Sequence, residues 1–150
     1  MPKIKTLIIT LFIISQIQSL NSINLDNENY DTEVNLSKEI WLIEFYSEKC
    51  GTCQEFFPIW EELIKNVNYL RVGRVNIDNE KGLNVALRLN ALENGIPCVK
   101  LNYGKDKLET IMVGTEDPLP NHNILKDRID KILHKKGKLN KGKYFVVEDL

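Results

Sequence analysis

Two cysteines separated by two residues are the part of this sequence best suited to chemistry. The motif CGTC at 50–53 follows a continuous apolar run, 40–46, and precedes apolar positions that recur at helical spacing to about Val67. Two cysteines on a first helical turn come within disulfide-bonding reach of each other. Amide groups at a helix N-terminus favour the thiolate, the species that attacks disulfides. The sequence therefore predicts a redox-active pair, with Cys50 as the exposed nucleophile and Cys53 as the deeper resolving thiol.

The neighbouring lysine and the other possible metal ligands bear on this interpretation. Lys49 places a cation next to Cys50 and is expected to favour its thiolate. The alternative is half of a zinc site, but zinc usually takes four nitrogen or sulfur ligands. The remaining candidates, Cys98, His122 and His134, are not paired at ligand spacing. We therefore expect no metal and no other cofactor, and we interpret Cys98 as a small buried hydrophobe, with a redox role as the alternative.

An acid interrupts the apolar run that leads to the cysteine motif. Glu44 precedes Cys50 by six positions, close enough for a strand to place it beneath the motif. A buried carboxylate costs on the order of several kcal/mol unless it is paired or protonated. Two roles that do not exclude each other stay open. Glu44 could carry a raised pKa and relay protons to or from Cys53, or it could form a salt bridge with Arg74 in the next predicted strand.

Residues 1–19 have the pattern of a cleaved secretory signal peptide. Two lysines precede a compact apolar run at 7–14, and Ser19, or alternatively Ser22, offers a small residue before a possible cleavage point. The apolar run is shorter than the roughly 20 residues that a membrane-spanning helix needs. We therefore expect no membrane anchor after cleavage.

Two further features concern the compartment. Asn35-Leu36-Ser37 is an N-glycosylation sequon, which is consistent with a lumenal protein. The last four residues, VEDL, resemble an acidic lumenal retention signal but end in Asp-Leu rather than Glu-Leu. We predict the lumen of the endoplasmic reticulum, with secretion as the alternative.

Charge and length limit the classes of partner. Removal of residues 1–19 takes away two lysines and no acids, so the net charge falls from −1 to −3, with charges of both signs interspersed. This balance gives no electrostatic reason to expect nucleic acid or an anionic membrane as a partner. The remaining residues, about 130, make one ordinary domain that can bury a core without metal or disulfide staples.

The order of the predicted elements indicates an α/β domain at 38–136, after a partly ordered lead-in at 20–37 and before a C-terminal tail at 137–150. The expected strands are 40–46, 70–77, 98–102 and 108–113, and the expected helices are 50–67, 79–89 and a last one that begins near 121 or 123. Crossovers through helices imply parallel strand pairs, and the short connection at 103–107 implies an antiparallel pair. We therefore predict one mixed sheet with helices on both faces.

Several of these motifs together resemble a known family. The block WLIEFYSEKCGTC at 41–53 resembles the active-site strand and motif of protein disulfide isomerase domains, including the acid six residues before the first cysteine. Pro58 matches the proline that kinks the family's active-site helix. VNID at 75–78 resembles the next strand of thioredoxins, with Arg74 where a lysine often stands, and Ile96-Pro97 matches the cis-proline turn.

The resemblance covers about residues 38–135 and implies a thioredoxin fold that makes, breaks or reshuffles disulfides. Pro97 would be cis and lie against the cysteine pair, and the backbone of Ile96 would bind an extended client segment. The implied partners are client proteins with thiols or disulfides and a redox-recycling partner that the sequence does not identify. The implied activity is that of a protein disulfide isomerase-like thiol–disulfide oxidoreductase.

Three residues depart from the family pattern. Lys49 replaces the usual tryptophan, Thr52 stands where isomerase domains carry a histidine, and Thr115 follows Gly114 where they often carry an arginine. Without the histidine the Cys50 thiolate loses a stabilising cation, so we expect a weaker oxidant than typical isomerase domains. The alternative function is therefore a redox-weak, thioredoxin-like module that binds clients in the manner of a chaperone.

Overall fold

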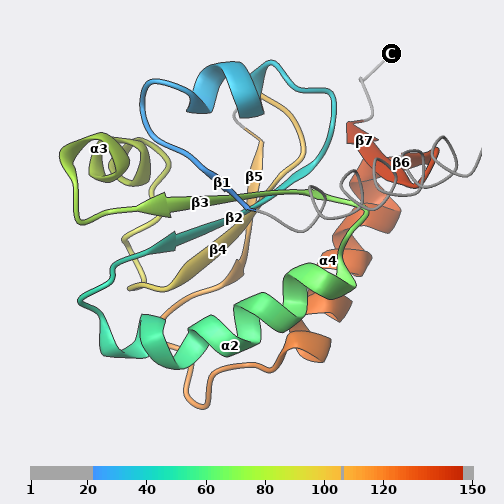
Figure 1. Ribbon diagram of the computed structural model, residues 1–150. Helices are drawn as coiled ribbons and strands as arrows, with labels where there is room; N and C mark the ends of the chain where they lie inside the picture. The colour runs from blue at the N-terminus through green and yellow to red at the C-terminus, as the bar shows by residue number, and fades with distance from the viewer. Residues whose placement is uncertain (1–21, 106, 147–150) are drawn as a thin grey trace, which may run out of the picture.

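The computed structural model describes residues 22–105 and 107–146 and has a five-stranded central sheet (Figure 1). The strands lie in the order β1-β3-β2-β4-β5, with bounds β1 (Ile23–Asn24), β2 (Trp41–Tyr46), β3 (Arg71–Asn76), β4 (Cys98–Asn102) and β5 (Leu108–Met112). β3 is parallel to both β1 and β2, whereas β4 is antiparallel to both β2 and β5. The mixed α/β sheet of a thioredoxin fold, expected from the sequence, is confirmed.

Helices cover both faces of this sheet (Figure 1). They are η2 (Asp31–Asn35), α2 (Gly51–Asn66), α3 (Glu80–Arg88) and α4 (His122–Lys136). One core cluster joins α2 and α4 to the face that carries Leu42, and a second joins η2 and α3 to the face that carries Ile43 and Phe45. We call these the α2 face and the α3 face. Because side chains alternate along a strand, Glu44 of β2 lies on the α2 face with Leu42.

Polar side chains begin the helices close to the expected positions. The Asn79 side chain accepts a hydrogen bond from the backbone N of Gly82 and caps α3. Asn121 accepts bonds from the backbone N of Asn123 and of Ile124 and caps α4. α2 begins directly after Cys50 and continues through Pro58. None of the described helices is long and apolar enough to span a membrane.

Segments on either side of the predicted domain also join the fold. Ile23 of the lead-in pairs with Gly73 of β3, where an added Cβ would overlap the Leu25 side chain. At the other end, β6 (Gly137–Asn140) and β7 (Lys143–Val146) form a hairpin. Tyr144 of this hairpin accepts a hydrogen bond from Ile40 N at 3.0 Å and donates one to Tyr69 O at 3.1 Å. The predicted signal peptide and the VEDL tail lie outside the described residues.

Candidate redox site

Cys50 occupies the N-cap of α2, at the carboxyl end of the central strand β2. Its Sγ accepts a hydrogen bond from the backbone N of Cys53 at 3.2 Å, and its thiol donates to the carbonyl O of Ile96 at 3.7 Å. Both cysteines are free thiols, Cys50 half-buried and Cys53 buried. Cys50 is therefore the more accessible sulfur, and an amide donor of the helix N-terminus points at it.

Cys53 lies one turn deeper, with only 5% of its surface exposed. Burial, followed by the hydrogen bond with Cys50, raises the pKa of the Cys53 thiol to about 12. The negative charge of Glu44 raises this pKa further, while the backbone of Ser47 opposes the shift. A thiol of this kind is almost wholly protonated at neutral pH, so it needs a nearby base before it can attack a disulfide.

Glu44 forms the salt bridge with Arg74 that the sequence suggested, and its proton relay to Cys53 stays a prediction. It is fully buried, and its Oε2 accepts a hydrogen bond from Arg74 Nε at 2.5 Å. Burial raises the pKa of Glu44, although the Arg74 guanidinium pulls that pKa down. Its other oxygen, Oε1, has no hydrogen-bond partner among the described residues. The carboxyl group is thus ion-paired on one side only.

Aromatic rings enclose the arginine, and the sequence did not indicate them. The Arg74 guanidinium lies 3.8 Å from the centroid of the Tyr46 ring and 5.3 Å from that of the Phe57 ring. A pocket of about 280 Å³ opens beside them and reaches Cys53, lined by Tyr46, Ser47, Glu48, Cys53, Gln54, Phe57 and Arg74. This pocket gives water a path to the buried thiol.

The proline turn lies beside Cys50, whose thiol contacts the Ile96 carbonyl. The Ile96–Pro97 peptide bond is cis, as the family resemblance implies. A Cβ added at Gly114 would overlap the carbonyl oxygen of Ile96, so the loop after β5 packs directly on this turn. Only glycine permits so close an approach of two backbones. Gly114 therefore helps to hold the Ile96 carbonyl where the Cys50 thiol reaches it.

Lys49 and Cys98 have different surroundings from the pair. The Lys49 side chain is exposed, and its charge slightly lowers the pKa of Asp78. Cys98 is 2% exposed within the core of the α3 face, so the sheet separates it from Cys53. Burial raises the pKa of Cys98 to about 11, partly opposed by Lys100. Among the described residues, no three His, Cys, Asp or Glu side chains are grouped to hold a metal.

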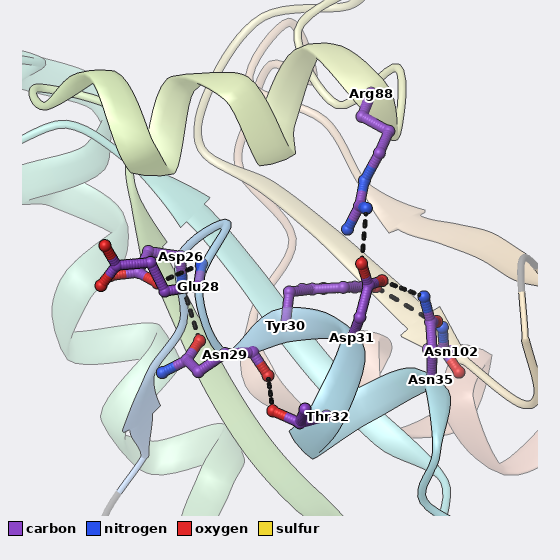
Figure 2. A network of polar contacts seen from close by, with 9 residues as sticks. All are labelled: Asp26, Glu28, Asn29, Tyr30, Asp31, Thr32, Asn35, Arg88 and Asn102. Carbon is purple, nitrogen blue, oxygen red and sulfur yellow. Dashed lines mark hydrogen bonds and ion pairs between the residues drawn. The ribbon is translucent and has the colours of Figure 1, made fainter.

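The sequon lies in a separate polar network on the α3 face (Figure 2). Asn35 ends η2, and its Nδ2 donates a hydrogen bond to Asp31 Oδ1 at 2.6 Å. Asp31 Oδ2 in turn accepts from Arg88 Nη1 of α3 at 2.9 Å. Glycosylation of Asn35 stays a prediction, and any glycan there would lie on the face opposite α2.

Comparison with known proteins places this site within one family. A sequence model of the family described as Thioredoxin matches residues 21–119. Protein disulfide isomerase-like 2-3 of Oryza sativa subsp. japonica is 34% identical over 87 residues, 57% of this chain and 19% of that protein. DnaJ homolog subfamily C member 10 of Rattus norvegicus is 35% identical over 92 residues, 57% of this chain and 12% of that protein. The chain thus spans less than a fifth of either relative.

Solved structures show the same fold. The crystal structure of the Trx4 domain of ERdj5 superposes with a TM-score of 0.61 at 24% sequence identity, covering 75% of this chain and 95% of that one. The J-Trx1 fragment of ERdj5 gives a TM-score of 0.62 at 24% identity over 75% of this chain and 50% of that one. From the family match and the shared fold, we conclude that this chain belongs to the thioredoxin family.

Proposed function

We propose that the chain is a thiol–disulfide oxidoreductase of the secretory pathway that acts on disulfides of client proteins through Cys50 and Cys53. The observation that carries this proposal is the hydrogen bond from Cys53 N to Cys50 Sγ at the start of α2. This bond favours a thiolate on the accessible sulfur, while the second sulfur, beside a buried acid, stays protonated until it is needed.

The reaction follows from these two environments. The Cys50 thiolate attacks one sulfur of a client disulfide, which forms a Cys50–client disulfide and releases the other client sulfur as a thiolate that takes up a proton. Cys53 then loses its proton to the carboxylate form of Glu44 and attacks Cys50 Sγ. The second client sulfur leaves as a thiolate that takes up a proton, and Cys50 and Cys53 end as a disulfide. The reverse sequence oxidises a client dithiol, and the reduction potential of the pair decides the direction.

The turn at Ile96-Pro97 supplies the docking surface in this proposal. The Ile96 carbonyl lies 3.7 Å from Cys50 Sγ, so a client segment bound along this backbone would bring its disulfide to the attacking sulfur. Backbone pairing of this kind accepts many client sequences, because main-chain hydrogen bonds supply the affinity. In this proposal, the clients and the partner that recycles the pair are defined only by their chemical class.

The compartment rests on the ends of the sequence and on the relatives. The basic and apolar pattern of residues 1–19, the sequon at Asn35 and the name protein disulfide isomerase carried by a relative all favour the lumen of the endoplasmic reticulum. Secretion is the alternative destination.

Trapping of clients tests the function. A Cys53→Ser variant should accumulate disulfide-linked complexes with client proteins, because nothing resolves the Cys50–client bond. The matched Cys50→Ser variant should form none. The enzymatic proposal fails if neither variant traps a client and the wild type neither reduces nor isomerises a test disulfide. Client binding that survives the loss of both cysteines would in that case favour the client-binding module.

A further inference from the structure

Asp78 connects the turn after β3 to the loop that carries the cysteine motif. Its Oδ1 accepts a hydrogen bond from the Ser47 hydroxyl at 2.6 Å, and its Oδ2 accepts one from the backbone N of Glu48 at 2.8 Å. The backbone N of Asp78 itself donates to Asn76 Oδ1 at 2.9 Å. The backbone of Asp78 is thus bonded to Asn76 at the end of β3, and both of its carboxylate oxygens accept hydrogen bonds from the 47–49 loop.

Ser47 passes this restraint on to the motif. The residue is 8% exposed, and its Oγ accepts a hydrogen bond from Lys49 N at 3.0 Å while donating to Asp78. Its carbonyl oxygen accepts a bond from Cys50 N at 3.3 Å. One hydrogen bond therefore connects Cys50 to Ser47, and a second connects Ser47 to Asp78.

The bonds to Asp78 suit a restraint of this kind. The hydrogen bonds from Ser47 and from the Glu48 amide lower the pKa of Asp78, so the carboxylate is ionised at neutral pH. Hydrogen bonds to an ionised acceptor are roughly twice as strong as neutral ones. Because Asp78 stays charged, it can hold the 47–49 loop in one conformation while the Cys50 sulfur exchanges disulfide partners.

We propose that Asp78 is a positioning residue for the redox reaction, acting through Ser47 to hold Cys50 Sγ against the Cys53 amide. The inference rests on the proposed function, since it concerns the reactivity of the same pair. Loss of this restraint weakens the hydrogen bond that Cys53 N gives to Cys50 Sγ. The Cys50 thiolate is then less stabilised, which slows its reactions and favours the disulfide over the dithiol.

The direction of the change in Cys50 reactivity distinguishes a positioning role of Asp78 from an effect of its charge. Ser47→Ala removes the bond between the Ser47 hydroxyl and Asp78 without altering any charge, and leaves the bond from Glu48 N to Asp78 in place. Asp78→Ala removes a negative charge as well, and that loss alone would favour the Cys50 thiolate and speed its reactions. Slower reaction of Cys50 in both variants therefore identifies lost positioning as the cause.

The test uses the full chain with Ser47→Ala, Asp78→Ala and the double variant, and with Asp127→Asn as a control that removes an exposed carboxylate on α4. Two quantities are measured: the rate of Cys50 alkylation, and the equilibrium in which oxidised glutathione converts the dithiol to the disulfide and yields two molecules of reduced glutathione. We expect alkylation at least threefold slower and the equilibrium shifted at least threefold toward the disulfide in both single variants. The double variant should be no more affected than Asp78→Ala, and the control should be unchanged.

Three results would overturn the inference. Unchanged rate and equilibrium in folded Ser47→Ala and Asp78→Ala, with at most a lower melting temperature, would leave Asp78 a purely structural role. Faster alkylation in Asp78→Ala with no change in Ser47→Ala would leave only a charge effect. A wild-type protein whose Cys50 and Cys53 never form a disulfide with oxidised glutathione would overturn the proposed function itself, an outcome distinct from the first two.

Discussion

Cys53 and Cys98 are two buried thiols that lie on opposite faces of the same sheet. They are 5% and 2% exposed, and burial raises the pKa of Cys53 to about 12 and that of Cys98 to about 11. Cys53 has a second thiol, a buried acid and a solvent pocket beside it. Cys98 has an apolar core cluster around it, and the nearby Lys100 amine donates to Thr110 Oγ1 at 3.0 Å. Burial alone therefore does not make a redox thiol, which also needs a partner sulfur, a base and access.

The arginine ion pairs of the two faces differ in the same way. Glu44 and Arg74 on the α2 face have side chains 0% and 17% exposed, whereas Asp31 and Arg88 on the α3 face are 56% and 46% exposed. A buried charge depends on its partner, because water cannot replace it. An exposed pair competes with water and contributes little. The buried Glu44–Arg74 pair therefore depends on its partner charge, whereas the exposed Asp31–Arg88 pair joins two surface segments.

The largest expected difference is between the two cysteine substitutions. Cys53→Ala should lower multiple-turnover reduction of a peptide disulfide by about 100-fold or more, because the mixed disulfide is no longer resolved. Cys98→Ala should leave the rate within about twofold, since no redox partner lies on its face. Thiol release from the peptide measures both. A loss of turnover in folded Cys98→Ala comparable to that in Cys53→Ala would remove the distinction between the faces.

The next largest effect concerns the buried ion pair. Arg74→Gln should lower the free energy of unfolding at neutral pH by about 3 kcal/mol, because it leaves Glu44 buried without its counter-charge. The loss should shrink in acid, where Glu44 can be protonated. Urea unfolding at several pH values measures it. If Arg74→Gln lowers the free energy of unfolding by no more than Arg88→Gln does, the burial of Glu44 has no effect on the strength of its ion pair.

The third prediction is a pH dependence. The pKa of Glu44 lies above its ordinary value of 4.5, so the folded state binds more protons than the unfolded state as the pH rises past that value. This contribution to stability is therefore present at low pH and is lost as the pH rises through the folded pKa of Glu44. Glu44→Gln should abolish the decline. It should also change the pH dependence of Cys53 reactivity, and no such change would argue against the proton relay.

The smallest effect is expected at the exposed pair of Figure 2. Arg88→Gln removes the ion pair with Asp31 but should lower the free energy of unfolding by less than about 1 kcal/mol, and the loss should diminish further in salt. Urea unfolding at low and high ionic strength measures it. A salt-independent loss of several kcal/mol would mean that η2 depends on this contact far more than its exposure implies.

Local patterns in the sequence were enough to predict much of the fold. Continuous apolar runs predicted the central strands, and polar residues at 78–79 and at 121 or 123 indicated two helix starts, which Asn79 and Asn121 cap in the structure. The Glu44–Arg74 pair could be anticipated because both residues belong to neighbouring buried strands. The cysteine motif was predictable because its chemistry depends on two cysteines separated by two residues.

Other features depend on contacts between distant segments, and no local pattern reports them. β1 has two residues, too few to show alternation, and β7 is defined by its pairing with β6 and by its bonds to Ile40 and Tyr69. The Ser47–Asp78 bond joins residues 31 positions apart, of types common in any turn. The rings of Tyr46 and Phe57 around the arginine are likewise products of packing.

The most direct test of the redox account is a titration of the wild-type chain in glutathione buffers, with mass-resolved thiol labelling at Cys50, Cys53 and Cys98. We predict that Cys50 and Cys53 become protected together in one two-electron step, with a measurable midpoint, while Cys98 stays a free thiol throughout. A pair that remains reduced even in fully oxidised glutathione, or a disulfide that includes Cys98, would contradict the account.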